Sequence, residues 1–198
     1  MSLKTDLEVI PVTPENWHDL ETLFGKNGAY GGCWCMWWRL TRSQFGTQAG
    51  QGKKDALKAI VDAGEVPGIL AYASGQPIAW CSVAPRATFP SLERSRLLKR
   101  VDDKPVWSIV CFYVAKPYRR KGLMAELLRA SIDYAGQCGA KIVEGYPIVP
   151  KHDDSPPVST FTGIFSAFEE VGFVEVTRRS EKRPIMRYFM EECNIAGD

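Results

Sequence analysis

A short basic turn at residues 119–122 separates two apolar segments and has the residue types of a phosphate-binding loop. Arg119, Arg120 and Lys121 bring positive charge together, and Gly122 lets the backbone approach a ligand closely because it has no Cβ. If a helix begins directly after the glycine, its N-terminal N–H groups and dipole add positive potential at the same place. This combination suits a pyrophosphate. The alternative is a solvated turn.

The flanking segments favour the binding loop over the solvated turn. Residues 106–114 form an apolar run typical of a buried strand. Residues 123–138 repeat apolar side chains at helical spacing as far as Gly139, a residue type that commonly ends helices. Residues 141–146 are again typical of a strand. This order of strand, basic glycine turn, helix and strand predicts a ligand site in an α/β domain.

Composition limits the classes of protein that the chain can belong to. With 198 residues and 45% hydrophobic residues, we expect one domain, residues 1–198, with a substantial core. A net charge of +2 is too small to indicate nucleic acid or an anionic membrane as partner. There is no apolar run of roughly 20 residues, as a membrane span requires, and no apolar N-terminal segment of the signal-peptide type. We therefore expect a cytoplasmic protein.

The cysteines are expected to be reduced thiols, as is usual in a cytoplasm. Cys81 and Cys111 lie within apolar strand patterns, which predicts that both are buried. The pair Cys33 and Cys35 raises the hypothesis of a metal site. However, the chain has only two histidines and no second close cysteine pair, so we predict that no metal is bound.

The remaining segments complete a mixed α/β domain around a single sheet. Further strands are predicted at 7–12, 66–72, 76–83, 173–179 and 184–190. Further helices are predicted at 14–25, 53–63, 91–100 and 160–171. A loop rich in glycine and aromatic residues follows the first of these helices, and a polar, proline-rich loop occupies residues 147–157.

The order of elements and the basic turn resemble the GNAT superfamily of acyl-CoA-dependent N-acyltransferases, and the resemblance covers nearly the whole chain. The family's pyrophosphate motif is Arg or Gln, two residues, Gly, one residue, then Gly or Ala. Here it is Arg119-Arg120-Lys121-Gly122-Leu123-Met124, with Met124 at the place of a small residue. The stretch from Phe168 to Gly172-Phe173 also resembles the family's penultimate helix and the Gly-Phe that follows it.

The resemblance implies where acyl-CoA would bind. The fourth strand would part from the fifth near Val114, and the pantetheine arm would pair with the backbone of Phe112 and Val114. Such pairing is physically reasonable because an unpaired strand edge offers partners to the amides of pantetheine. The Val114 N–H would also polarise the thioester carbonyl, as in an oxyanion hole. Residues 119–124 would hold the pyrophosphate.

The chain departs from the family at both usual proton-handling positions. Ser108 stands where many members carry a glutamate base, and Phe168 stands where many carry a tyrosine acid. We predict Glu144 as the general base because its strand borders the expected cleft. The alternatives are a solvated carboxylate at Glu144 and proton transfer through water. Other candidate bases are His152, Asp153 and Asp154, and candidate acids are Tyr113, Tyr118 and Tyr146.

The aromatic loop has two interpretations. Trp34, Trp37 and Trp38 are either core residues or a wall of the acceptor site, where they and Tyr30 would stack on an aromatic acceptor or hold a cation. The resemblance favours the second, since the segment between the first two helices commonly borders the acceptor site in the family. Arg39 would then contact an acceptor carboxylate.

Together these observations predict an N-acetyltransferase that transfers an acetyl or short acyl group from acyl-CoA to an amine. We expect acetyl-CoA as co-substrate, no metal, a small-molecule acceptor, no nucleic-acid or membrane partner, and a monomer or homodimer. The alternative is a non-catalytic acyl-CoA sensor or regulatory module, which the substitutions at Ser108 and Phe168 favour. An RNA-binding domain is disfavoured because the basic patch is short and the net charge is low.

Overall fold

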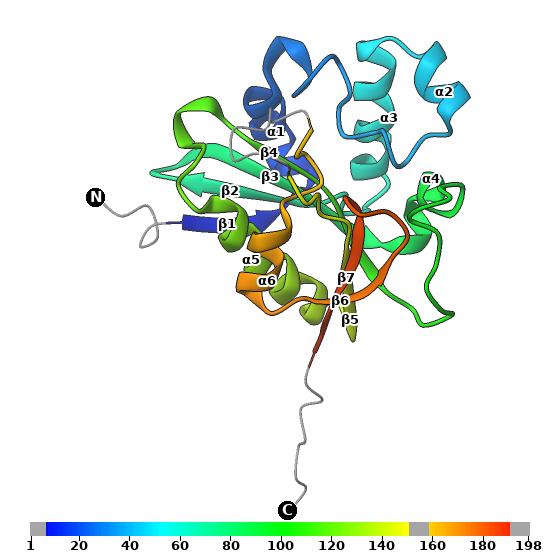
Figure 1. Cartoon of the computed structure of the whole chain (residues 1–198). Helices are drawn as coiled ribbons and strands as arrows, with labels where there is room; N and C mark the ends of the chain where they lie inside the picture. Colours follow the sequence, from blue (N-terminus) through cyan, green and yellow to red (C-terminus); the bar gives the residue numbers. More distant parts are fainter. Residues whose placement is uncertain (1–6, 151–158, 191–198) are drawn as a thin grey trace, which may run out of the picture.

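The structure, a computed structural model, describes residues 7–150 and 159–190 (Figure 1). Its strands are β1 (Leu7–Pro11), β2 (Ile69–Ala73), β3 (Gln76–Pro85), β4 (Trp107–Val114), β5 (Ile142–Gly145), β6 (Val174–Arg178) and β7 (Pro184–Phe189). Its helices are α1 (Trp17–Phe24), α2 (Arg42–Thr47), α3 (Gly50–Asp62), α4 (Pro90–Glu93), α5 (Leu123–Gln137) and α6 (Phe165–Val171). The strands form one mixed sheet in the order β1-β2-β3-β4-β5-β7-β6.

Helices cover both faces of the sheet (Figure 1). On one face, Leu20 of α1 and Leu57 of α3 are fully buried in a core with Trp80 of β3. On the other face, Leu127 of α5 and Phe168 of α6 are fully buried in a second core. Within the described ranges, no helix is both long enough and apolar enough to cross a bilayer.

The predicted strands and the helix after the basic turn are confirmed, whereas several helix boundaries were wrong. The sequence did not predict α2, which begins with a reciprocal capping box between Thr41 and Gln44. Helix α3 begins at Gly50, and α4 ends at Glu93, well before residue 100. Helix α6 begins only at Phe165, after a left-handed residue and an extended one, so residues 160–164 are not helical.

The sheet parts between strands β4 and β5. The pairing of β4 with β3 skips Val110, because Ile109 faces Val83 and Cys111 faces Ser82, so Val110 is the extra residue of a β-bulge. Residues 107–109 pair in parallel with residues 143–145 of β5. Beyond this short ladder, β4 continues to Val114 without pairing to β5. The single mixed sheet with strands that part after β4 is therefore confirmed.

Candidate active site

The basic turn lies at the N-terminus of α5, as predicted. A single 3-10 turn, Lys116–Tyr118, connects it to the end of β4. Gly122 is the N-cap of α5 and has a φ of +77°, in the left-handed region that favours glycine. The helix that follows leaves its first N–H groups, including those of Leu123 and Met124, without acceptors inside the helix. An anionic ligand at this end would meet these donors and the positive end of the helix dipole.

The cations of the turn have different surroundings. Arg119 is half-buried, and its Nε donates a hydrogen bond of 2.8 Å to the carbonyl of Val114. This contact fixes the turn to the last residue of β4. Arg120 and Lys121 are exposed, and the Lys121 ammonium lies 5.5 Å from the centre of the Tyr118 ring. The turn therefore presents two exposed charges beside a third that is held by a hydrogen bond.

The backbone edge of β4 is only partly open. The Phe112 N–H donates a hydrogen bond of 2.7 Å to the carbonyl of Phe161. For the Val114 N–H, no hydrogen bond outside the sheet is found among the described residues. The structure thus brings Val114 and the basic turn together, while the chain itself engages the donor of Phe112.

Glu144 is fully buried, so the interpretation as a solvated carboxylate was wrong. One carboxylate oxygen accepts hydrogen bonds from Arg86 Nη1 at 2.8 Å and from the Tyr146 hydroxyl at 2.7 Å. The other accepts one of 2.8 Å from Arg187 Nε. Because both oxygens are occupied by charged or polar donors, this geometry does not favour the predicted role of Glu144 as general base.

The contacts of Glu144 belong to a buried polar network that joins β4, β5 and β7 to Arg86, directly after β3. Arg187 also binds both oxygens of Asp102, at 2.7 and 3.0 Å. Burial alone would lower the pKa of Arg86, but the nearby carboxylates of Glu144 and Glu93 outweigh this effect and raise it. The network lies at the short ladder between β4 and β5, beside the point where these two strands begin to part.

The side chains beside the network are equally enclosed. Ser108, at the family's usual base position, is fully buried and shares a hydrogen bond of 2.8 Å with the Tyr146 hydroxyl. Burial, with the charge of Glu144, raises the pKa of Tyr146 well above its ordinary value, so this phenol stays neutral. Tyr113 and Tyr118 are half-buried. The other candidate bases, His152, Asp153 and Asp154, lie outside the described residues.

Sequence reasoning missed the two arginines of the network. Arg187 is a cation inside the apolar strand β7, and Arg86 directly follows β3. A charged residue within an apolar strand pattern is a signal that it has a buried partner. The identity of the partner could not be predicted from the sequence, since Arg86 and Glu144 are 58 residues apart.

The three tryptophans of the aromatic loop divide between the two interpretations. Trp34 and Trp38 belong to the core, and Trp38 Nε1 donates a hydrogen bond of 3.1 Å to the carbonyl of the bulge residue Val110. In contrast, Trp37 is 45% exposed, with one edge against Phe45. Only Trp37 is thus placed on the surface, where an acceptor can reach it.

Arg39 is largely buried, and no carboxylate of the described residues forms an ion pair with it. Its Nη2 donates a hydrogen bond of 3.0 Å to the Pro67 carbonyl, and its guanidinium lies 4.5 Å from the centre of the Phe89 ring. Its Nε has no hydrogen-bond partner within residues 7–150 and 159–190, and burial lowers its pKa to about 10. The predicted contact with an acceptor carboxylate stays a prediction.

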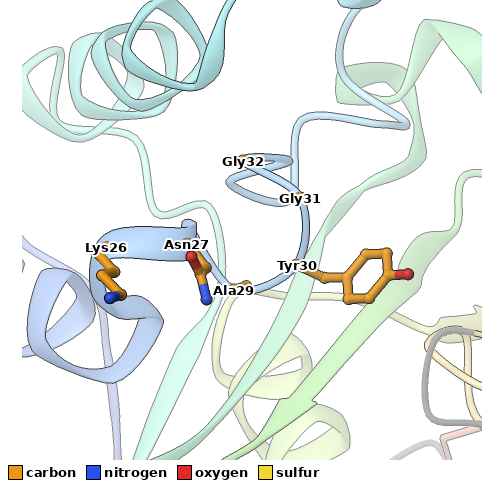
Figure 2. Close-up of a pocket in the computed structure, with 6 residues that line it drawn as sticks. All are labelled: Lys26, Asn27, Ala29, Tyr30, Gly31 and Gly32. Atoms are coloured by element: carbon orange, nitrogen blue, oxygen red, sulfur yellow. The ribbon is translucent and has the colours of Figure 1, made fainter.

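A pocket of about 350 Å³ lies in the loop that precedes the tryptophans (Figure 2). It is lined by Lys26, Asn27, Ala29, Tyr30, Gly31 and Gly32. In Figure 2, Lys26 and Asn27 lie on one side of the loop, and the ring of Tyr30, which is 64% exposed, points away from them. The pocket therefore lies on the segment that the sequence predicted to border the acceptor, with Lys26 and Tyr30 among its lining residues.

The described cysteines are free thiols, and the prediction that Cys81 and Cys111 are buried is confirmed. The sulfur atoms of Cys35 and Cys111 lie 3.1 Å apart. Across residues 7–150 and 159–190, no group of three or more His, Cys, Asp or Glu side chains could hold a metal ion.

The splayed mixed sheet with a basic glycine turn beside the opening is the architecture expected from the resemblance to acyl-CoA-dependent acyltransferases. Residues 34–148, more than half of the chain, match the family model described as the acetyltransferase (GNAT) family. The chain therefore belongs to the GNAT acetyltransferase family, whose class of reaction is acyl transfer from acetyl-CoA. Comparison with curated protein sequences found no significant match.

Solved structures of acetyltransferases share the fold. YncA of Salmonella typhimurium, solved with its cofactor acetyl-CoA, is 12% identical, with a TM-score of 0.54 over 95% of this chain and 96% of that one. Ribosomal-protein-alanine N-acetyltransferase of Brucella melitensis is 13% identical, with a TM-score of 0.54 over 92% and 99%. PaiA N-acetyltransferase of Thermoplasma acidophilum, solved with coenzyme A, is 13% identical, with a TM-score of 0.51 over 94% and 100%.

Proposed function

We propose that this protein is an N-acetyltransferase that transfers the acetyl group of acetyl-CoA to the amine of a small molecule. The observation that carries the proposal is the junction of β4 with the basic turn. There the hydrogen bond from Arg119 to the Val114 carbonyl places an open backbone donor beside a helix N-terminus and a cluster of cations. The arrangement suits a ligand with amides at one end and a pyrophosphate at the other.

Each part of this junction has a role in the proposal. The pyrophosphate binds at the first turn of α5, where Gly122 leaves room for it and Arg120 and Lys121 neutralise its charge. The pantetheine arm runs along β4 toward the bulge. The Val114 N–H polarises the thioester carbonyl and stabilises the negative charge that develops on its oxygen.

Proton transfer is assigned to water rather than to Glu144. An amine with a pKa of about 10.4 is protonated at pH 7, and neutralising it costs about 4.6 kcal/mol. Glu144 cannot relieve that cost from its position, because both of its oxygens are engaged by Arg86, Arg187 and Tyr146. The rate is therefore expected to follow the neutral fraction of the acceptor. The CoA thiolate is a good leaving group and needs no dedicated acid.

One observation favours a second function, the non-catalytic acyl-CoA sensor. Neither usual proton-handling position offers a titratable group, since Ser108 and Phe168 occupy them and both are fully buried. A sensor of this kind would bind acetyl-CoA at the same junction without turning it over.

Release of the CoA thiol distinguishes the two functions. The protein is incubated with acetyl-CoA and a panel of small amines, free thiol is followed with a disulfide reagent, and the acetylated product is identified by mass spectrometry. The proposal expects release that depends on the amine and rises with pH as the amine becomes neutral. Tight acetyl-CoA binding without release for any amine would support the sensor instead.

The pyrophosphate site predicts a selective effect of Gly122→Val. The new side chain would project into open space where the ligand must approach, so acetyl-CoA affinity should fall at least tenfold, about 1.4 kcal/mol. Gly139→Val, at the other end of α5, is a matched control because Gly139 also has a positive φ, +84°, and open space at its Cβ. Calorimetry should show the loss only for Gly122→Val. Equal affinities of the two variants would mean that the pyrophosphate binds elsewhere.

The aromatic loop predicts opposite outcomes for two neighbouring residues. Trp38→Ala should lower the free energy of unfolding by about 3–5 kcal/mol because it empties a core position. Trp37→Ala should change it by less than about 1 kcal/mol, yet raise KM for the best amine of the panel without weakening acetyl-CoA binding. Urea unfolding and two-substrate kinetics measure both effects. An unchanged amine KM for Trp37→Ala would remove Trp37 from the acceptor site.

A further inference from the structure

The gap beyond the β4–β5 ladder is filled by the chain itself. Where β5 ends, the chain continues to Ile148, and residues 161–164 lie between Ile148 and β4. On the β4 side, the Phe161 carbonyl accepts the hydrogen bond of 2.7 Å from the Phe112 N–H. The segment therefore engages the backbone donor that the acyl arm was predicted to use.

The other side of the segment pairs with the extension of β5. The Ile148 N–H donates to the Gly163 carbonyl, and the Phe165 N–H donates to the Ile148 carbonyl, both at 2.9 Å. Ile148 and Ile164 form an isolated parallel bridge. Residues 161–164 thus continue the sheet across the gap as a short inserted piece of backbone.

Side chains hold the segment in place, and two of them belong to residues at which the sequence departs from the family pattern. The Met124 sulfur accepts a hydrogen bond of 3.4 Å from the Ile164 N–H. The Phe168 ring packs so closely on Gly163 that a Cβ there would lie 2.5 Å from it. In addition, Arg183 Nη1 donates a hydrogen bond of 3.0 Å to the hydroxyl of the fully buried Thr162.

We propose that residues 161–164 are an internal occupant of the acyl-arm groove, and that acyl-CoA binds productively only when the Phe161 carbonyl leaves the Phe112 N–H. Met124 and Phe168 are positioning residues that keep the segment on β4. An acceptor of the acyl arm then replaces the Phe161 carbonyl, so the Phe112 N–H is paired in both states. The inference rests on the proposed function, because it takes the groove to be the place of the arm.

Nuclear magnetic resonance of the isotope-labelled protein tests the exchange directly. In the free protein, the scalar coupling through the hydrogen bond should connect the Phe112 amide nitrogen to the Phe161 carbonyl carbon. With saturating acetyl-CoA this coupling should vanish, and the Phe112 amide resonance should shift. Persistence of the coupling in the bound protein would show that the segment is a fixed wall of the groove and would overturn the proposal.

Two variants of Met124 provide an independent measurement. Met124→Leu keeps the bulk and removes the sulfur acceptor, while Met124→Ala removes both. Each should weaken the coupling between residues 112 and 161 in the free protein and tighten acetyl-CoA binding by about three- to tenfold, because less of the protein is in the occupied state. Tighter binding of Met124→Ala alone, with an unchanged coupling, would place the effect at the pyrophosphate and contradict the proposal.

Failure of the proposed function would look different. If acetyl-CoA binds neither the wild-type protein nor the Met124 variants, although the free protein shows the coupling, then the groove is not a site for the acyl arm. If acetyl-CoA binds and the coupling persists, only the proposal that residues 161–164 are an internal occupant of the groove is wrong.

Discussion

Glu144→Gln is expected to lower the free energy of unfolding by about 3–5 kcal/mol, because it leaves two buried guanidinium groups without their shared carboxylate. Arg86 and Arg187 are 5% and 3% exposed, so water cannot replace the lost charge. The substitution keeps the shape of the side chain, which separates loss of charge from loss of packing. Urea unfolding at neutral pH measures the change.

Asp133→Asn is the matched control for that experiment. Asp133 is an exposed carboxylate on α5, and removing its charge should change the free energy of unfolding by no more than about 0.5 kcal/mol. If Glu144→Gln is as stable as the wild type but loses its acetyltransferase activity, then Glu144 acts in the reaction, and its assignment to the structural network is wrong.

Val114→Pro is expected to weaken acetyl-CoA binding by at least 100-fold, about 2.7 kcal/mol, because it removes the backbone donor that we propose for the acyl arm. The sheet should tolerate the change. The Ala115 N–H donates to Ile78 of β3, and neighbouring amides of a strand point in opposite directions, so the Val114 N–H faces away from β3. Calorimetric titration with acetyl-CoA measures the affinity.

Val114→Ile is the control, since it alters the side chain at the same position and keeps the N–H. Its acetyl-CoA affinity should stay within about threefold of the wild-type value, well under 1 kcal/mol. A comparable loss of affinity in both variants, with both proteins folded, would mean that side-chain packing rather than amide pairing holds the arm.

The part of the fold that depends on local sequence could be predicted. The apolar run of β4, Gly122 and the helical spacing of α5 lie within one short stretch, so their order identified the basic turn and its place at a helix N-terminus. Hydrophobic periodicity likewise located the remaining strands. These signals also led to the correct family.

The features set by contacts across the sheet could not be predicted. Glu144 lies in a strand with an unremarkable local pattern, and only the folded chain brings Arg86 and Arg187 to it. The different exposure of Trp37 and Trp38 has the same origin. Trp38 packs against β4 and donates a hydrogen bond to the carbonyl of Val110, which is 72 residues further along the chain. Adjacent residues of one loop can therefore have opposite environments.

The start of α6 shows how one residue can override a helical pattern. Residues 160–171 have the composition of a helix, yet Gly163 takes a φ of +96° and the helix begins two residues later. The preceding backbone instead pairs with Phe112 and Ile148 in the gap of the sheet. Nothing in the local sequence indicates that this segment will pair with the unpaired edge of a distant strand.

A crystal structure of the protein with bound acetyl-CoA is the most direct test of the site at the junction of β4 and α5. We expect the pyrophosphate within hydrogen-bonding distance of the first amides of α5, beside Arg120 and Lys121, and the acyl arm paired with the Val114 N–H. A cofactor bound away from residues 119–124, or an arm that does not contact β4, would contradict this placement and the acetyl transfer proposed from it.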